Sequence, residues 1–190
     1  MKRILKENIN TKVYWNKLLN KGEWGKERGA IYKKLYKYLP NSKNIIALDI
    51  GCATGHGIIA LAKKLTNIKF EACDFSEKGI IQANKLYGNK IRFFIHDISK
   101  DKLNKKYDYI LFIETLEHIE KPKEAIEKYL EYCNKRILVT VPYKELGWKE
   151  HVYYFDENSF NDIKEFKEFH IFNKPKASTR IILYIFDKKS

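Results

Sequence analysis

The chain is poor in the residues that mark several classes of protein. Its 190 residues include three cysteines, four prolines and one methionine. The odd number of cysteines (Cys52, Cys73 and Cys133) and their unpaired spacing predict free, buried thiols, and argue against a disulfide framework or a zinc site. Apolar stretches such as Tyr109 to Ile113 and Ile181 to Phe186 have the length of strands, far short of a membrane span.

The start of the chain also lacks an apolar run that fits a signal peptide, so we expect a cytoplasmic protein. The length suits one domain with a full core. A content of 44% hydrophobic and 32% charged residues is ordinary for a globular protein. These features together favour a single globular domain without a membrane span.

Acidic residues are outnumbered, and the excess of basic residues is unevenly placed. Lysine and arginine number 37 against 24 aspartates and glutamates, which gives a net charge of +13. Residues 1–46 hold 12 basic and 3 acidic side chains, so +9 of that charge lies there. A basic face can attract a polyanion such as RNA. The lysines are dispersed and include no arginine-rich run, which favours a general bias in composition.

From residue 45 onward, apolar segments of strand length alternate with amphipathic segments of helical period. This alternation predicts a parallel sheet that is covered by helices on both faces. The last two strands have no helix between them, which predicts an antiparallel strand at the end of the sheet. The expected strands span 45–50, 68–73, 91–95, 107–113, 135–141, 166–172 and 179–186, and the expected helices span 57–66, 76–87, 122–133 and 156–164.

Residues 1–44 precede this alternating unit. They contain two apolar stripes at helical spacing, namely Trp15, Leu18 and Leu19, then Ile31, Leu35 and Leu39. A loop with Trp24 between glycines joins the stripes. We interpret residues 1–44 as a helical cap near the mouth of a ligand site, within the same domain as residues 45–190.

A glycine-rich turn, Gly51-Cys52-Ala53-Thr54-Gly55, joins the first predicted strand of this unit to its first helix. Ligands of open parallel sheets bind outside the carboxyl ends of the strands, where the strand order reverses. A helix start there also presents backbone N–H groups. We expect Asp49, at the end of the strand, to hold the turn by accepting backbone N–H bonds. Ala53 fits between the glycines if its φ is negative.

Two further acidic residues end the next strands. Asp74 comes 23 residues after Gly51, the spacing of a carboxylate that accepts from ribose hydroxyls. Asp97 follows the third strand and could accept from an adenine amino group. The glycines depart from the Gly-x-Gly-x-x-Gly of dinucleotide sites, and residues 45–61 offer a pyrophosphate no basic partner. A nicotinamide-dependent reductase is therefore the less favoured cofactor alternative.

Four segments in order resemble those of the class I S-adenosylmethionine-dependent methyltransferases: Leu48-Asp49-Ile50-Gly51-Cys52-Ala53-Thr54-Gly55, Ala72-Cys73-Asp74-Phe75-Ser76, His96-Asp97-Ile98, and Tyr107-Asp108-Tyr109-Ile110 leading to Glu114-Thr115-Leu116-Glu117-His118-Ile119. The resemblance covers residues 45–186. It implies a Rossmann-like, doubly wound α/β fold with seven strands in the order 3-2-1-4-5-7-6, strand 7 antiparallel.

The resemblance also implies S-adenosylmethionine as the cofactor and assigns residues to it. Gly51 and Gly55 would approach its methionine part, Asp74 the ribose and Asp97 the adenine, with Phe75 and Ile98 flanking the adenine ring. The full predicted cofactor set is Asp49, Gly51, Cys52, Ala53, Gly55, Asp74, Phe75, Asp97, Ile98 and Glu114.

The acidic segment after the fourth strand supplies the catalytic candidates Glu114, Glu117 and His118, and His151 lies later in the chain. On a short helix that starts here, Glu114 would share a face with Glu117 or His118. Carboxylates and imidazoles are ligands for a divalent metal such as Mg²⁺ or Mn²⁺. The set resembles that of metal-using methyltransferases acting on the terminal 2′-hydroxyl of small RNAs or on catechol-type hydroxyls in ubiquinone biosynthesis.

In those families the corresponding residues bind a metal that lowers the pKa of the attacking hydroxyl. The same segment occurs in small-molecule methyltransferases not known to need a metal, where the histidine is a base or orients the turn. Metal ligation, a base or orienting role and structural capping therefore all stay open for His118. Aromatic residues after the fifth strand, Trp148 among them, could stack on a ring or base.

These observations favour a methyltransferase that acts on an oxygen or nitrogen atom of a small-molecule acceptor, because the segments lie on one domain without an elaborated substrate domain. One alternative is an RNA 2′-O-methyltransferase that uses a divalent metal. The other is a non-catalytic cofactor-binding protein with the same fold.

Overall fold

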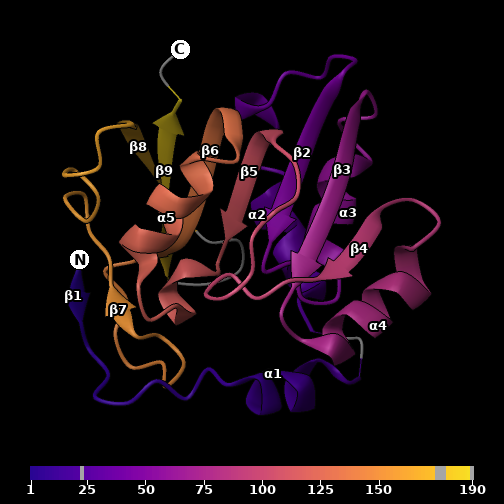
Figure 1. Cartoon of the computed structure of the whole chain (residues 1–190). Coiled ribbons are helices and arrows are strands. Elements are labelled where there is room, and N and C mark those ends of the chain that lie inside the picture. The colour runs from indigo at the N-terminus through magenta and orange to yellow at the C-terminus, as the bar shows by residue number, and fades with distance from the viewer. Residues whose placement is uncertain (22–23, 174–178, 189–190) are drawn as a thin grey trace.

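A seven-stranded sheet in the order β4-β3-β2-β5-β6-β9-β8 forms the centre of the molecule, seen in a computed structural model that describes residues 1–21, 24–173 and 179–188 (Figure 1). β9 runs antiparallel to both of its neighbours, and the other pairs are parallel. Numbered among themselves, the strands follow the order 3-2-1-4-5-7-6, which confirms the predicted fold. They are β2 (Ile45–Ile50), β3 (Ile68–Asp74), β4 (Arg92–Ile95), β5 (Tyr107–Ile113), β6 (Cys133–Tyr143), β8 (Phe166–Asn173) and β9 (Arg180–Asp187).

Helices cover both faces of the sheet. The short α2 (Gly29–Tyr32) packs on one face with α3 (His56–Ala62) and α4 (Glu77–Tyr87), and α5 (Pro122–Leu130) packs on the other. A hydrophobic core lies on each face of the sheet, and successive strand residues point into the two cores in turn. Ala47 faces the α3 side and Leu48 the α5 side. Burial on both faces explains why the strands are nearly continuous apolar runs.

The amino-terminal segment lies along the carboxyl ends of the parallel strands, where α1 (Lys12–Leu19) crosses below β2 and β3 in Figure 1. The preceding β1 (Lys2–Arg3) pairs with β7 (Tyr153–Tyr154), away from the main sheet. Three single 3₁₀ turns complete the regular structure: η1 (Lys26–Arg28), η2 (Tyr36–Tyr38) and η3 (Leu116–His118). None of the helices in the described part of the chain is both long and apolar enough to cross a membrane.

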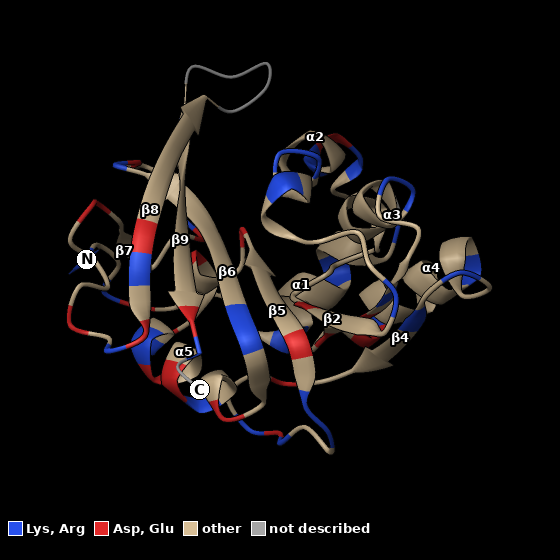
Figure 2. Cartoon of the chain, turned by 90° about the horizontal axis from the view of Figure 1, so that it is seen from above, with Lys and Arg blue, Asp and Glu red and all other residues tan. Residues whose placement is uncertain are grey.

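Two compositional predictions can be compared with the structure. Cys52, Cys73 and Cys133 are all buried and free, as predicted. Lysine and arginine occur on both sides of the sheet, in the segments that flank α2 and α3 as well as on α5 (Figure 2). The basic residues are therefore spread over the surface instead of forming one continuous stripe.

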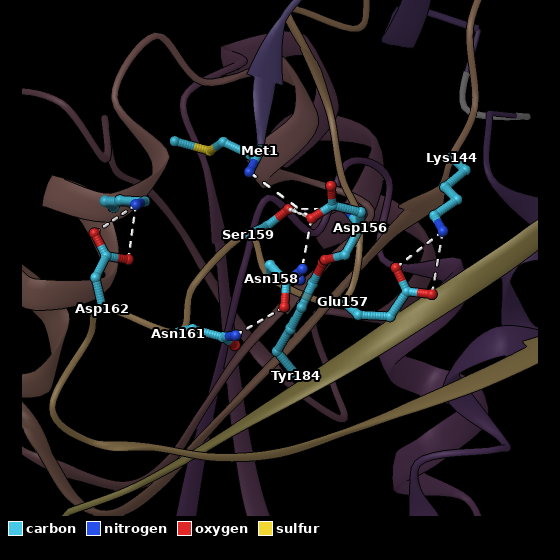
Figure 3. A network of polar contacts seen from close by, with 10 residues as sticks. Met1, Lys144, Asp156, Glu157, Asn158, Ser159, Asn161, Asp162 and Tyr184 are labelled. Carbon is cyan, nitrogen blue, oxygen red and sulfur yellow. Dashed lines mark hydrogen bonds and ion pairs between the residues drawn. The ribbon is translucent and has the colours of Figure 1, made fainter.

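The predicted helix over 156–164 is wrong, because the segment folds as consecutive turns. Polar side chains near its start bond to the local backbone instead (Figure 3). Ser159 Oγ accepts from the Asp156 N–H at 2.8 Å, and Asp156 Oδ1 accepts from the Asn158 N–H at 3.1 Å. Tyr184 donates its hydroxyl hydrogen to the Asp156 carbonyl oxygen at 2.5 Å, which occupies an acceptor at the segment's start. Such local bonds compete with the helical ladder.

Candidate active site

The glycine-rich turn after β2 has an unusual backbone. Gly51 and Gly55 have φ of 84° and 80°, and Ala53 between them has φ of 51°. The condition of a negative φ, under which an alanine fits here without strain, is therefore not met. The conformation is held by the Ala53 N–H, which donates to Asp74 Oδ2 at 2.9 Å, and by the Gly55 N–H, which donates to the Cys52 carbonyl. The left-handed conformation of Ala53 thus lowers the stability of the folded protein by roughly 1 kcal/mol.

Asp49 has a different role from the one expected. It is fully buried, and its Oδ2 accepts a hydrogen bond from the Tyr32 hydroxyl at 2.8 Å. Among the described residues its Oδ1 has no hydrogen-bond partner, so the prediction that Asp49 accepts backbone N–H bonds is wrong. Burial, opposed by the Tyr32 bond and aided by the charge of Asp74, raises the pKa of Asp49 to about 7.

A glycine makes this contact possible. A Cβ on Gly57 would lie 2.1 Å from the ring of Tyr32, so only glycine lets that ring pass α3 and reach Asp49. Gly51 is similarly confined, because its Cβ would meet Thr115 Oγ1 at 2.4 Å. The glycines of the turn therefore serve packing between α2, α3 and the segment after β5 as well as the backbone conformation.

A cavity of about 410 Å³ opens at the carboxyl ends of β2, β3 and β5, and residues of α1 contribute to its lining. Seven predicted cofactor residues line it, and three do not: Asp49, Cys52 and Gly55 lie outside its lining. The cap also contributes side chains, among them Trp15 and Trp24. The seven are Gly51, Ala53, Asp74, Phe75, Asp97, Ile98 and Glu114.

Two of the acidic residues that line this cavity, Asp74 and Asp97, are held by backbone amides. Asp74 accepts from the N–H groups of Ala53 and Ser76, each at 2.9 Å, which fixes the plane of the carboxylate. Burial raises the pKa of Asp74 although both of these bonds act to lower it. Asp97 Oδ1 accepts from the Ser99 N–H at 2.9 Å. Each carboxylate oxygen has a second lone pair that can accept a hydrogen bond from a ligand hydroxyl or amine.

A second cavity of about 210 Å³ adjoins the first. Glu117 and His151 line only this second cavity. Five side chains line both cavities and therefore mark their junction: Trp15, Trp24, Arg28, Glu114 and His118. The four predicted catalytic residues thus surround one space that meets the predicted cofactor pocket.

Three of those four residues form a compact group of donor atoms. One atom each from Glu117, His118 and His151 lies within 4.8 Å of the others. Glu114 is not part of this group, although it lines the same cavity. The expected helix with Glu114 on its face is wrong: Glu114 precedes the single turn η3 and has φ of 54°.

Burial and neighbouring charges set the electrostatics of this group. Burial and the carboxylate of Glu114 raise the pKa of Glu117 to about 7, opposed by His151. Burial acts to lower the pKa of His151, but the hydrogen bond to Glu145 and the surrounding carboxylates outweigh it and raise that pKa. The carboxylate and imidazole donors are those that divalent metals accept, so the group fits such an ion.

The tautomer of His118 follows from its hydrogen bond. Its Nδ1 lies 3.0 Å from the carbonyl oxygen of Glu150, which can only accept. Nδ1 therefore carries the hydrogen, and in the neutral ring Nε2 keeps its lone pair. Nε2 lies 3.8 Å from Glu117 Oε1, on the side of the second cavity.

No functional role is predicted from the sequence for Arg28, Tyr32, Glu145 or Glu150. Arg28 lies at the junction of the cavities and donates from Nη1 to the Glu114 carbonyl at 3.2 Å. No local pattern marks it, because its contact bridges 86 residues of the chain. Tyr32 could have been suspected only from its place beside the predicted apolar stripe.

Comparison with known proteins bears on this geometry. Residues 48–136 match the model of a family described as a methyltransferase domain. A tRNA N(3)-methylcytidine methyltransferase of Schizosaccharomyces pombe, trm141, is 28% identical over 100 residues, which is 49% of this chain and 40% of that protein. The (S)-tetrahydroprotoberberine N-methyltransferase of Eschscholzia californica is 31% identical over 102 residues, 50% of this chain and 28% of that protein. The chain thus spans less than half the length of these curated relatives.

A solved structure extends the likeness over the whole fold. The magnesium protoporphyrin IX methyltransferase ChlM of Synechocystis PCC 6803, with S-adenosylhomocysteine bound, superposes with a TM-score of 0.65. The alignment has 19% sequence identity and covers 84% of each chain. At this identity the likeness concerns the fold, and the bound molecule is the product that S-adenosylmethionine leaves. The match of residues 48–136 to a methyltransferase-domain family and the shared fold thus agree with the resemblance to the class I S-adenosylmethionine-dependent methyltransferases.

Proposed function

We propose that this chain transfers a methyl group from S-adenosylmethionine to an oxygen or nitrogen atom of a small-molecule acceptor. The observation that carries the proposal is the junction of two cavities. The larger is lined by the residues predicted to bind the cofactor, and the smaller by the predicted catalytic residues. A methyl group presented at the junction would meet an acceptor in the smaller cavity over a short path.

The residues of the larger cavity have matching chemistry for the cofactor. Asp74 would accept from the ribose hydroxyls and Asp97 from the adenine amino group, with Phe75 and Ile98 flanking the adenine ring. Gly51 lets the cofactor's methionine part approach the backbone. When bound, S-adenosylmethionine supplies an electrophilic methyl carbon on a sulfonium. The protein is left to orient the acceptor, exclude water and accept a proton.

His118 and Glu117 are the groups suited to the proton. The hydrogen on His118 Nδ1 is committed to the Glu150 carbonyl, so Nε2 with its lone pair would be the base. Glu117 lies beside it and would stabilise the protonated ring. His151, whose Nδ1 lies 3.3 Å from Glu145 Oε2, also lines this cavity and would orient the acceptor.

The first experiment is titration calorimetry with S-adenosylhomocysteine on the wild type, Asp74→Asn and the surface control Asp162→Asn. The loss of charge-assisted hydrogen bonds should weaken binding by at least tenfold in Asp74→Asn, since each contributes about 1.5–3 kcal/mol. Asp162→Asn should bind as the wild type does. No binding to the wild type would refute the proposal.

Turnover is the second test, measured as S-adenosylhomocysteine released with a panel of amines and hydroxyl compounds. His118→Ala should lose turnover of any acceptor that the wild type methylates. If the wild type binds S-adenosylhomocysteine but methylates no acceptor of a broad panel, the non-catalytic alternative is favoured instead.

The grouping of Glu117, His118 and His151 favours a second candidate, metal-assisted methylation of a hydroxyl. These residues would hold a divalent ion, and when bound the ion would lower the pKa of a hydroxyl. Chelation should then abolish turnover, and added Mn²⁺ or Mg²⁺ should restore it. Turnover that is unchanged by a chelator would exclude this candidate.

An RNA 2′-hydroxyl is the acceptor that this second candidate and the basic amino-terminal segment would suit. By its name, trm141 acts on tRNA at N3 of cytidine, so it supports an RNA acceptor but not a 2′-hydroxyl. Against it, the basic side chains are spread over both sides of the sheet (Figure 2). Electrophoretic shift of small RNAs at physiological salt tests this acceptor, and absence of binding would exclude it.

A further inference from the structure

The second cavity has an aromatic wall made of five rings in succession. Trp24 contacts Trp15 with ring centroids 5.9 Å apart, and Trp15 contacts His118 at 5.1 Å. His118 contacts His151 at 5.3 Å, and His151 stacks on Trp148 at 6.0 Å. All three tryptophans of the chain therefore line this one space.

The rest of the lining is strongly acidic. Five of the described residues that line the cavity are glutamates and one is an arginine: Glu27, Glu114, Glu117, Glu145 and Glu150, with Arg28. Four of these glutamates are largely shielded from water, since Glu114 and Glu117 are buried and the side chains of Glu145 and Glu150 are 9% and 16% exposed. On a chain with a net charge of +13, this is a local reversal of sign.

An independent observation points from this wall to a ligand. Glu117 is 1% exposed, and its Oε2 makes no hydrogen bond to any described residue. A buried carboxylate oxygen without a partner is costly unless a donor or a cation supplies the missing interaction. Glu117 lines the cavity, so a ligand there can supply it. Arg28 is engaged elsewhere, because it donates to the Glu114 carbonyl.

One ring of the wall already contacts a cationic side chain of the protein itself, Arg28. The guanidinium carbon of Arg28 lies 5.8 Å from the centroid of the Trp24 ring. Indole faces attract cations through their quadrupole, and cages of aromatic rings bind methylated ammonium groups. Aromatic rings and carboxylates in the same cavity combine the two interactions that recognise such a group.

From these features we infer that the acceptor is an amine that enters the second cavity as a cation, held by the tryptophan faces and the surrounding carboxylates. The inference rests on the proposed methyl transfer. The ammonium proton would pass to His118 Nε2, with Glu117 beside it, and the nitrogen lone pair would form the bond to the methyl carbon. The electrons of the broken C–S bond stay on sulfur, which leaves S-adenosylhomocysteine and the methylated amine. Phosphate-rich acceptors are disfavoured because they would face five glutamates.

The test compares choline with 3,3-dimethylbutan-1-ol, which has the same shape without the charge. Every tryptophan lines the second cavity, so binding there should change the intrinsic fluorescence. Trp15 and Trp24 also line the first cavity, whereas Trp148 lines the second cavity without the first, so loss of the change in a Trp148 variant assigns it to the second. Choline should change the emission with an affinity at least tenfold above that of the neutral compound. Equal affinity for the two, or a change produced by Mg²⁺ or Mn²⁺ alone, would overturn the inference.

Variants of Trp148, at the exposed end of the wall, test whether its aromatic ring contributes to choline binding without disturbing the fold. Trp148 is 57% exposed, so its replacement leaves the core intact. Trp148→Leu should weaken choline binding by about threefold to thirtyfold, the range of a cation–π contact worth about 0.5–2 kcal/mol. Trp148→Phe should retain most of it. Equal loss in both variants would refute a role for the aromatic face.

S-adenosylhomocysteine titrations on the same proteins keep the two proposals apart. Binding of S-adenosylhomocysteine without preference for choline would overturn the inference and leave the proposed function in place. Preference for choline without binding of S-adenosylhomocysteine would overturn both, since the cation site would then serve no methyl transfer.

Discussion

Asp49 should make the folded protein less stable as the pH rises through the neutral range. Its carboxyl is fully buried, one oxygen accepts from Tyr32, and the other has no partner among the described residues. Burial, with the nearby charge of Asp74, raises its pKa from 3.8 to about 7. The folded protein therefore binds a proton at Asp49 under conditions where the unfolded chain has released it.

The sign and size follow from proton linkage. Between the pKa of the unfolded chain and the raised pKa of the folded protein, the unfolded chain releases a proton that the folded protein keeps. The free energy of unfolding therefore falls between about pH 4 and pH 7. At about 1.4 kcal/mol per pH unit, the total for Asp49 is about 4 kcal/mol. Glu117, with its pKa raised to about 7, and His151, with a raised pKa, change stability in the same direction. Carboxyls with lowered pKa values, such as Glu157 at about 2, titrate below this window.

Urea unfolding between pH 5 and pH 8, followed by circular dichroism without cofactor, measures the effect. Asp49→Asn keeps an acceptor oxygen for Tyr32 and removes the charge. The variant should exceed the free energy of unfolding of the wild type by about 1.6 kcal/mol near pH 5 and by about 4 kcal/mol at pH 8. Asp162→Asn, at an exposed site, should keep the wild-type slope. If Asp49→Asn and the wild type lose stability equally with pH, the buried carboxylate is not the cause.

Two further predictions concern the backbone of the glycine-rich turn. Ala53→Gly should raise the free energy of unfolding by about 0.5 kcal/mol, because relief of the left-handed alanine exceeds the added entropy of the unfolded chain. Ala60→Gly, inside α3, should instead lower it by about 1 kcal/mol, and equal losses in the two variants would contradict the strain at Ala53. Gly57→Ala should lower the free energy of unfolding by about 3 kcal/mol, because the added Cβ would meet the ring of Tyr32. Wild-type stability of Gly57→Ala in thermal unfolding would show that the ring moves freely.

The sheet could be predicted because its determinants are local. β2, β5 and β6 are short apolar runs buried on both faces, and the helices between them show the 3.6-residue period. The segment 156–164 has an apolar spacing that also fits a helix. The segment forms turns and no helix, and one contributing bond comes from Tyr184, which lies 28 residues away and donates to the Asp156 carbonyl. A window of local sequence contains no sign of that bond.

The candidate site divides in the same way. Asp74 and Asp97 end strands, so the edge of the sheet brings them to the cofactor cavity without further information. Glu114 and Ala53 have left-handed conformations that their residue types do not predict. Each is held by bonds from distant segments: the Glu114 N–H donates to the Thr140 carbonyl, and the Ala53 N–H to Asp74.

The acceptor cavity depends most on contacts that no local pattern shows, because the cap and the loop after β6 build it jointly. Asn10 links the two: its Nδ2 donates to the Glu150 carbonyl at 2.8 Å, and its Oδ1 accepts from Trp15 Nε1 at 3.1 Å. The same Glu150 carbonyl accepts from His118 Nδ1. One asparagine of the amino-terminal segment thus connects the aromatic wall to the carbonyl that fixes the tautomer of His118. The cofactor cavity is built on the edge of the sheet, which is common to proteins of this fold. The acceptor cavity is built from connecting segments, which vary most between proteins of the same fold, so these segments determine which acceptor can bind.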